Sequence, residues 1–201
     1  MKKKNLMKSL TALALSVLMV LSLAACGAKP SDGGKDEDKD GYTVAIIKQM
    51  DHASLDEIAD AIAARLDAIA QEQNVSIRYT ITSGQGDQSV LKQLADQAVA
   101  DKVDAIIPIA TTAAQVSAVA AEDSRTPVVY AAISDPDTAK LTGIDYVTGT
   151  SDALNTEYIL DMMLAQDPGV SKVGLLYSLS EPNSTKPIAE AKAYLEQHGI
   201  T

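Results

Sequence analysis

The sequence contains few of the residue types that commonly cross-link a small domain or carry chemistry. Its 201 residues include one cysteine, two histidines, no tryptophan and no phenylalanine. A single cysteine cannot form an internal disulfide, so stability must come from packing alone. Two isolated histidines do not indicate a metal site or a catalytic triad. With aromatic residues at 3% and hydrophobic residues at 46%, the core must be built from Ala, Val, Ile, Leu and Met.

Basic residues and long apolar runs are also scarce. Lysine and arginine total 17 against 27 acidic residues, which gives a formal net charge of −10. A surface of this sign repels phosphate backbones, so the composition argues against a nucleic-acid partner. The one extended apolar run, from Leu10 to Ala25, has the length of a signal-peptide core and is too short for a membrane-spanning helix.

The single cysteine, Cys26, stands directly behind this run and follows Leu23-Ala24-Ala25. With the basic start at Lys2 to Lys4, this layout is typical of a bacterial lipoprotein signal, in which the thiol accepts a diacylglycerol and becomes the new N-terminus. One acyl chain contributes about 0.8 kcal/mol per buried CH₂, so firm anchoring needs more than one chain. We expect residues 1–25 to be a signal peptide, and fatty acids such as palmitate to anchor Cys26 on the extracytoplasmic face of the cell membrane. The alternative is an ordinary secretory signal with a chance cysteine.

Residues 26–41 are polar and charged, which predicts a disordered tether behind the anchor. From Tyr42 onward, short β-type runs alternate with longer helical periods. This alternation predicts right-handed βαβ crossovers and an open parallel sheet with helices on both faces, so the expected fold class is α/β. Strands are expected at 42–48, 75–81, 105–109, 127–131 and 146–149. Helices are expected to begin at Ser54, Asp87, Thr112 and Ser151.

A further strand at 172–177 and a helix at 187–198 follow, so residues 42–150 are expected to form an N-terminal lobe and 151–201 the start of a second α/β lobe. One strand between two helices is too little sheet to close a core. We therefore expect the chain to be a truncated version of a longer protein. The alternative is a compact one-domain protein whose last helix packs on the first sheet.

Candidate binding residues lie in the loops that follow the strands, because ligands of open α/β sheets bind beyond the carboxyl ends of the strands. These loops are rich in hydroxyl and amide groups with a few carboxylates. Such a lining suits a small zwitterion, whose carboxylate meets hydroxyls and helix N-terminal amides and whose ammonium meets an acidic side chain. Helix capping alone also explains several of these residues, and Asp135-Pro136 also reads as a turn. The loop Ser83–Asp87 lacks the features of a phosphate loop, and no cofactor is expected.

Six segments, taken in order, carry a resemblance to a known family. They are Gln49-x-Asp51-His52-x-x-Leu55-Asp56, Gly84-Gln85-Gly86-Asp87, Ile109–Gln115, Ser134-Asp135-Pro136, Val147–Asp152 and Glu181-x-Asn183-Ser184. From Tyr42 to its end the chain resembles the ABC transporter substrate-binding lipoproteins, a type I periplasmic-binding-protein-like group that includes proposed tryptophan and tyrosine binders. The resemblance implies two α/β lobes, a ligand held in the cleft between them, and an ABC permease as partner. It implies that the ligand contacts Gln49, Asp51, Ser83, Thr111, Thr112, Ser134, Asp135, Glu181, Asn183 and Ser184.

The sequence thus favours a binding protein rather than an enzyme: a tethered receptor that captures a small solute, an amino acid above all, for an importer. Two alternatives stay open at this point. An anchored hydrolase on a flavodoxin-like scaffold would need a general base, and only His52 offers itself. A sensory lipoprotein that presents its ligand to a membrane kinase would have the same sequence features.

Overall fold

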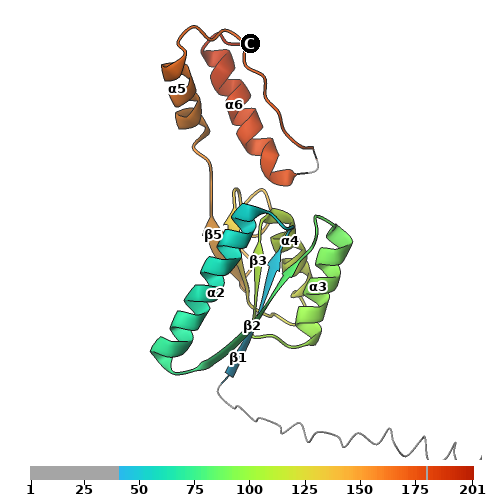
Figure 1. Ribbon diagram of the computed structural model, residues 1–201. Helices are drawn as coiled ribbons and strands as arrows, with labels where there is room; N and C mark the ends of the chain where they lie inside the picture. Colours follow the sequence, from blue (N-terminus) through green and yellow to red (C-terminus); the bar gives the residue numbers. More distant parts are fainter. Residues whose placement is uncertain (1–40, 180) are drawn as a thin grey trace, which may run out of the picture. The chain divides into compact units, whose positions relative to one another are not determined.

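The computed structural model describes residues 41–179 and 181–201, and the predicted signal peptide, Cys26 and most of the predicted tether lie outside this part. Five parallel strands form one sheet in the order β2-β1-β3-β4-β5 (Figure 1). The strands are β1 (Gly41–Lys48), β2 (Ser76–Ser83), β3 (Ala105–Ile109), β4 (Val128–Ile133) and β5 (Val147–Ser151). The predicted α/β class and parallel sheet are confirmed.

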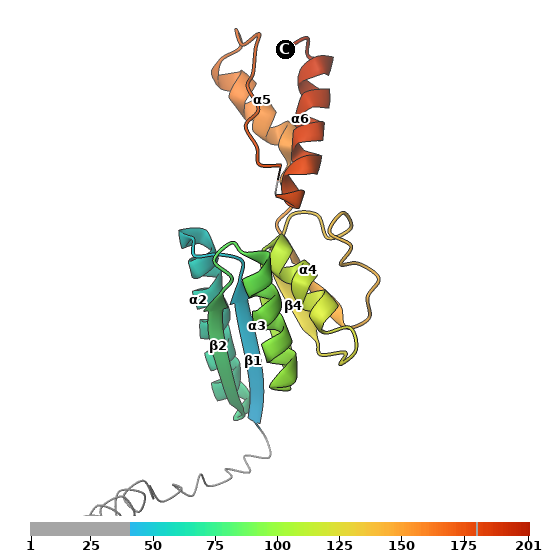
Figure 2. The same cartoon turned by 90° about the vertical axis from the view of Figure 1, so that its right-hand side faces the viewer.

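Helices cover both faces of this sheet. Helix α2 (Ala53–Gln73) packs on one face, and α3 (Gln88–Ala100) and α4 (Thr111–Ala120) pack on the other (Figure 2). Strand β1, which lies inside the sheet between β2 and β3, shows why helices must cover both faces. Its side chains alternate between faces, so Val44 and Ile46 contact the α2 side while Ala45 and Ile47 contact the α3 side. All four are buried, as expected for a parallel strand with neighbours on both edges.

The starts of the helices correct part of the sequence prediction. Asp87 caps α3 as expected, because its side chain accepts hydrogen bonds from the backbone N–H groups of Ser89 and Val90. Ser54 does not cap α2. The cap is His52, whose Nδ1 accepts a hydrogen bond from the Ser54 backbone N–H at 3.3 Å. Thr112 lies inside α4, which begins one residue earlier.

The segment beyond β5 departs further from the prediction. Ser151 ends β5 instead of starting a helix, and helix α5 (Thr156–Gln166) is capped by Asn155. A short 3₁₀ helix, η1 (Pro182–Ser184), leads into α6 (Thr185–Gln197), and α5 and α6 share a small core that includes Leu160 and Leu195.

The strand predicted at 172–177 is not formed. Within the described residues, its backbone pairs only with Thr201, which donates to the Ser171 carbonyl at 3.1 Å and accepts from the Val173 N–H at 2.8 Å. A strand needs a ladder of such partners, and Leu176 is 99% exposed. The division into lobes at residue 150 stays a prediction. No described helix combines the length and apolar character needed to cross a membrane.

Candidate ligand-binding site

The parallel arrangement brings the loops after β1, β2, β3 and β4 to one edge of the sheet, and the predicted binding residues before position 150 all lie there. Gln49 is the most firmly held of them. It follows β1 directly, is only 8% exposed, and its backbone N–H donates to the Ile109 carbonyl at 3.1 Å. Its side-chain Oε1 accepts a hydrogen bond from the backbone N–H of Thr112 at 3.1 Å. Gln49 thus satisfies a free amide of the first turn of α4 from a distant part of the chain.

The other end of the Gln49 amide faces the segment after residue 180. Its Nε2 lies 3.4 Å from both carboxylate oxygens of Glu181. At this length each contact is weak, so Glu181 keeps most of its capacity to accept hydrogen bonds from another donor. Gln49, Thr112 and Glu181, three of the predicted site residues, are therefore connected by one side chain.

The loop after β2 needs a glycine at position 84. Its backbone N–H donates to the Lys48 carbonyl at 2.9 Å, and a Cβ at this position would clash with the buried Leu91 side chain and lie 3.1 Å from the Gln49 carbonyl oxygen. The close approach of this loop to β1 thus depends on the missing side chain.

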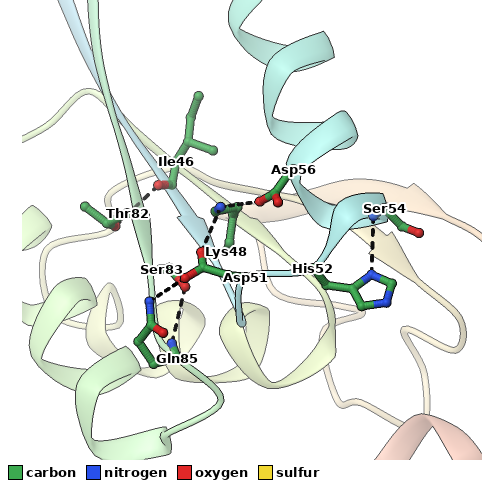
Figure 3. Close-up of polar contacts among 9 residues, drawn as sticks. All are labelled: Ile46, Lys48, Asp51, His52, Ser54, Asp56, Thr82, Ser83 and Gln85. Atoms are coloured by element: carbon green, nitrogen blue, oxygen red, sulfur yellow. Dashed lines mark hydrogen bonds and ion pairs between the residues drawn. The ribbon is translucent and has the colours of Figure 1, made fainter.

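Asp51 and Ser83 belong to a polar network that ties the loops after β1 and β2 together (Figure 3). Asp51 accepts a hydrogen bond from Gln85 Nε2 at 2.7 Å and pairs with Lys48 Nζ at 3.0 Å, while Lys48 also pairs with Asp56 in the first turn of α2. Hydrogen bonds from Gln85, Lys48 and Ser83 lower the pKa of Asp51, and those to Asp56 and Asp51 raise the pKa of Lys48. Asp51 is thus largely occupied by the protein itself.

Asp135 lies in the loop after β4, where its side chain is 13% exposed. Its carboxylate accepts hydrogen bonds from the backbone N–H of Thr138 at 3.0 Å and the Thr138 hydroxyl at 2.9 Å. Lys186 Nζ, from the first turn of α6, pairs with Asp135 Oδ2 at 3.0 Å. The Thr138 N–H, followed by Lys186 and the Thr138 hydroxyl, lowers the pKa of Asp135 to about 2, so the carboxylate is ionised at neutral pH.

A cavity of about 10 Å³ lies at this point. It is lined by Thr111, Asp135, Thr138, Ala139, Pro182, Asn183 and Lys186. The structure therefore brings three predicted residues, Thr111, Asp135 and Asn183, to one hollow. Such a volume holds about one water molecule, far less than the hundreds of Å³ of a typical ligand pocket.

Two of the remaining predicted residues have other partners. The Ser134 hydroxyl donates to Asp152 at 3.0 Å, and the Ser184 backbone N–H donates to the Glu181 carbonyl at 3.0 Å. The sequence analysis did not identify Lys48, Thr138 or Lys186. Lys186 follows Asn183-Ser184 closely, but the predicted helix start at Pro187 left it out. Helix α6 begins at Thr185, so Lys186 lies in its first turn; a correct prediction of this start would have identified Lys186 as a candidate.

The backbone is strained where β3 passes into α4. Ala110 has φ 77° and ψ 164°, a region that only glycine adopts readily and that costs another residue about 1–3 kcal/mol. This conformation directly precedes Thr111, which is buried and lines the cavity.

The chemistry available at the edge is that of recognition. Hydroxyls, side-chain amides, carboxylates and the ammonium groups of Lys48 and Lys186 lie along it. His52, the base of the hydrolase alternative, already accepts a hydrogen bond from Ser54. The described residues contain no group of three or more His, Cys, Asp or Glu side chains that could hold a metal ion.

Comparisons with known proteins bear on the family and the fold of the chain. A family described as "ABC transporter substrate binding protein" matches residues 43–201. The "Tyrosine-binding protein" of Clostridioides difficile (strain R20291) is 27% identical over 201 residues, which cover 95% of this chain and 58% of that protein. A Streptococcus pneumoniae ABC domain solved in complex with L-Trp is 34% identical with a TM-score of 0.71, over 80% of this chain and 55% of that one.

A conserved domain protein of Vibrio cholerae is 26% identical with a TM-score of 0.72, again over 80% of this chain and 55% of that one. These similarities confirm the predicted type I periplasmic-binding-protein-like fold. The chain spans little more than half the length of these relatives.

Proposed function

Because this chain belongs to the family of ABC transporter substrate-binding proteins, we propose that it captures a small solute outside the cytoplasmic membrane and delivers it to the permease of an ABC importer. The candidate site suits an amino acid best, and the carboxyl edge of the parallel sheet is its binding place.

The observation that carries the proposal is the convergence of Thr111, Asp135 and Asn183 on one hollow at the edge where the strands end. An ionised carboxylate is a strong acceptor for an ammonium group. The hydroxyl and amide groups beside it suit a carboxylate, which the positive end of the α4 dipole also favours. An amino acid carries both groups on one carbon atom, so it matches this mixed lining better than a sugar or a simple anion does.

The names of the relatives support the choice of an amino acid, aromatic ones included. One relative is called tyrosine-binding, and another was solved with L-Trp. The exposed apolar side chain of Met50, between Gln49 and Asp51, offers a surface that an aromatic ring can contact.

The proposal includes a lipid anchor at Cys26, supported by the apolar run and the small residues that precede it. A receptor held at the membrane stays close to the permease that it serves. Anchoring and capture are independent parts of the proposal, and each has its own test.

Ligand fluorescence gives a direct test of capture. The chain has no tryptophan, so the emission of added L-tryptophan can be followed without a protein background from that residue. We expect a saturable change in emission on titration with protein, reversed by L-tyrosine and not by myo-inositol. Asp135→Asn should weaken binding at least tenfold, since hydrogen bonds to charged groups contribute about 1.5–3 kcal/mol.

The matched control is Asp123→Asn, an exposed aspartate in the loop between α4 and β4. It keeps the net charge equal to that of Asp135→Asn and should bind like the unchanged chain. The absence of a saturable signal with L-tryptophan, together with the absence of heat in calorimetry with L-tyrosine and other amino acids, would contradict the proposal.

A further inference from the structure

The ammonium group of Lys186 lies against the Asp135 carboxylate, the group of the candidate site that suits a cation. Its Nζ lies 3.0 Å from Asp135 Oδ2, while Thr138 holds the same carboxylate through its N–H and its hydroxyl. The Thr138 contacts come from the loop that carries Asp135 itself. The Lys186 contact comes from α6, about fifty residues away in sequence, and the Lys186 side chain is 58% exposed. The Thr138 contacts are therefore fixed by the local loop, whereas the Lys186 contact can be broken by a movement of α6 or of the Lys186 side chain.

The size of the cavity shows that the present arrangement has no room for a solute. The hollow between Thr111, Asp135, Asn183 and Lys186 measures about 10 Å³. A cavity of this size holds about one water molecule, and an amino acid is several times larger than a water molecule. The groups from η1 and α6 must therefore move away from Asp135 before a solute can enter, and the ion pair must open.

We propose that Lys186 is an internal competitor of the solute: its ammonium occupies on Asp135 the place that the α-ammonium group of an amino acid takes in the complex. This inference rests on the proposed function and deepens it, because it identifies the group that the solute must carry. A primary ammonium group is required. Anionic or neutral solutes lack the group that replaces Lys186 and do not bind tightly.

The exchange leaves the charge at Asp135 balanced. Lysine and an amino acid both present an alkylammonium group with three N–H donors. When one replaces the other on Oδ2, Asp135 keeps both hydrogen bonds from Thr138, and no buried carboxylate is left without a cation. The displaced Lys186 is not left alone either, since the carboxylates of Glu190 and Asp137 attract its ammonium.

One substitution tests the inference by whether it raises or lowers the affinity for the solute. Lys186→Met keeps an unbranched side chain only one atom shorter and removes the competing charge. We expect the full chain carrying it to bind L-tryptophan more tightly, by up to about fivefold, because an exposed ion pair contributes about 0.2–1 kcal/mol. Lys192→Met, on the same helix but directed to the Tyr177 ring, is the matched control and should leave affinity unchanged. If Lys186 instead bound the carboxylate of the solute, Lys186→Met would weaken binding, and that result would overturn the inference.

Ligand analogues give a second test that depends on no variant. 3-Indolepropionate lacks the ammonium group of tryptophan and should bind the unchanged chain at least tenfold more weakly. In the Lys186→Met chain it should still bind weakly, since Asp135 then has no cation. Equal affinity of the unchanged chain for both compounds would overturn the inference and leave the proposed function standing. If no amino acid binds the unchanged chain, either by L-tryptophan fluorescence or by calorimetry, the proposed function fails and the inference falls with it.

Discussion

The side-chain oxygen of Gln49 accepts a hydrogen bond from the backbone N–H of Thr112, 63 residues later, at 3.1 Å. A residue at the end of β1 thereby satisfies the first turn of α4, a role that a neighbouring Ser, Thr, Asp or Asn usually plays. Ala110, the residue at the N-cap position, makes no side-chain bond. The start of α4 therefore depends on a long-range contact at the candidate site.

Replacing Gln49 tests this dependence. Gln49→Leu removes the acceptor and leaves the Thr112 N–H without its partner in a largely buried place, so we expect the free energy of unfolding to fall by about 1–3 kcal/mol. Urea unfolding followed by circular dichroism measures the change. Gln93→Ala, at an exposed position of α3, should change stability by no more than about 0.5 kcal/mol. Equal effects of both variants would contradict the role assigned to Gln49.

Gly84→Ala should destabilise the protein by about 1–3 kcal/mol, because the new Cβ overlaps the Leu91 side chain, which packs in the core and cannot move freely. Thermal unfolding measures the loss. At Gly174 a Cβ would meet nothing within 4 Å, so Gly174→Ala is the matched control and should be close to neutral. A neutral Gly84→Ala would mean that the loop after β2 relaxes away from β1.

Ala110→Gly should stabilise the protein, against the usual direction of this substitution. Glycine adopts φ 77° and ψ 164° without the cost that alanine carries, and we expect a gain of up to about 1 kcal/mol after the greater chain entropy of glycine is subtracted. Ala64→Gly, in the exposed middle of α2, should instead cost about 0.5–1 kcal/mol. Denaturation midpoints of the two variants should therefore move in opposite directions, and a parallel decrease would exclude strain at Ala110.

The low pKa of Asp135 predicts that the protein loses stability in acid. Its pKa is about 2 in the folded protein against an ordinary value of 3.8, so folding favours the ionised form. The stabilisation is fully present above the ordinary value and is lost as the pH falls towards 2. Unfolding free energies measured across this range should fall less steeply for Asp135→Asn than for the unchanged chain. Identical slopes would show that Asp135 titrates normally in the folded protein.

Cys26→Ser should release the protein from the membrane. The thiol is the proposed attachment point of the lipid, and serine cannot form the thioether. Fractionation of cells and labelling with radioactive palmitate provide the measurement, and the unchanged chain should be recovered in the membrane fraction with label. Membrane retention and labelling of the Cys26→Ser chain would contradict a lipid anchor at this residue.

Features that depend on neighbouring residues could be predicted from the sequence. The strand of β1 and the cap at Asp87 were predicted because each is set by residues within a few positions. The cap at Ser54 was wrong because two neighbouring residues could supply it, and His52 does. The strand at 172–177 was wrong because an apolar β-type run becomes a strand only when another backbone pairs with it.

In the candidate site, too, the sequence predicted the local features and not the long-range contacts. Gln49, Thr111, Asp135 and Asn183 could be named as candidates because the loops of a parallel sheet share one edge. Their partners could not be named. The Gln49–Thr112 bond and the Asp135–Lys186 pair join residues that no periodicity relates.

The sequence by itself determined the order of strands and helices as far as β5, and the residue types that its strand-end loops carry, since hydrophobic period and turn chemistry act over short distances. Only the tertiary structure decided which polar groups meet. Those contacts depend on the packing of β1, β3, β4 and α6 as whole elements, which places Lys186 on Asp135 and Thr112 beside Gln49.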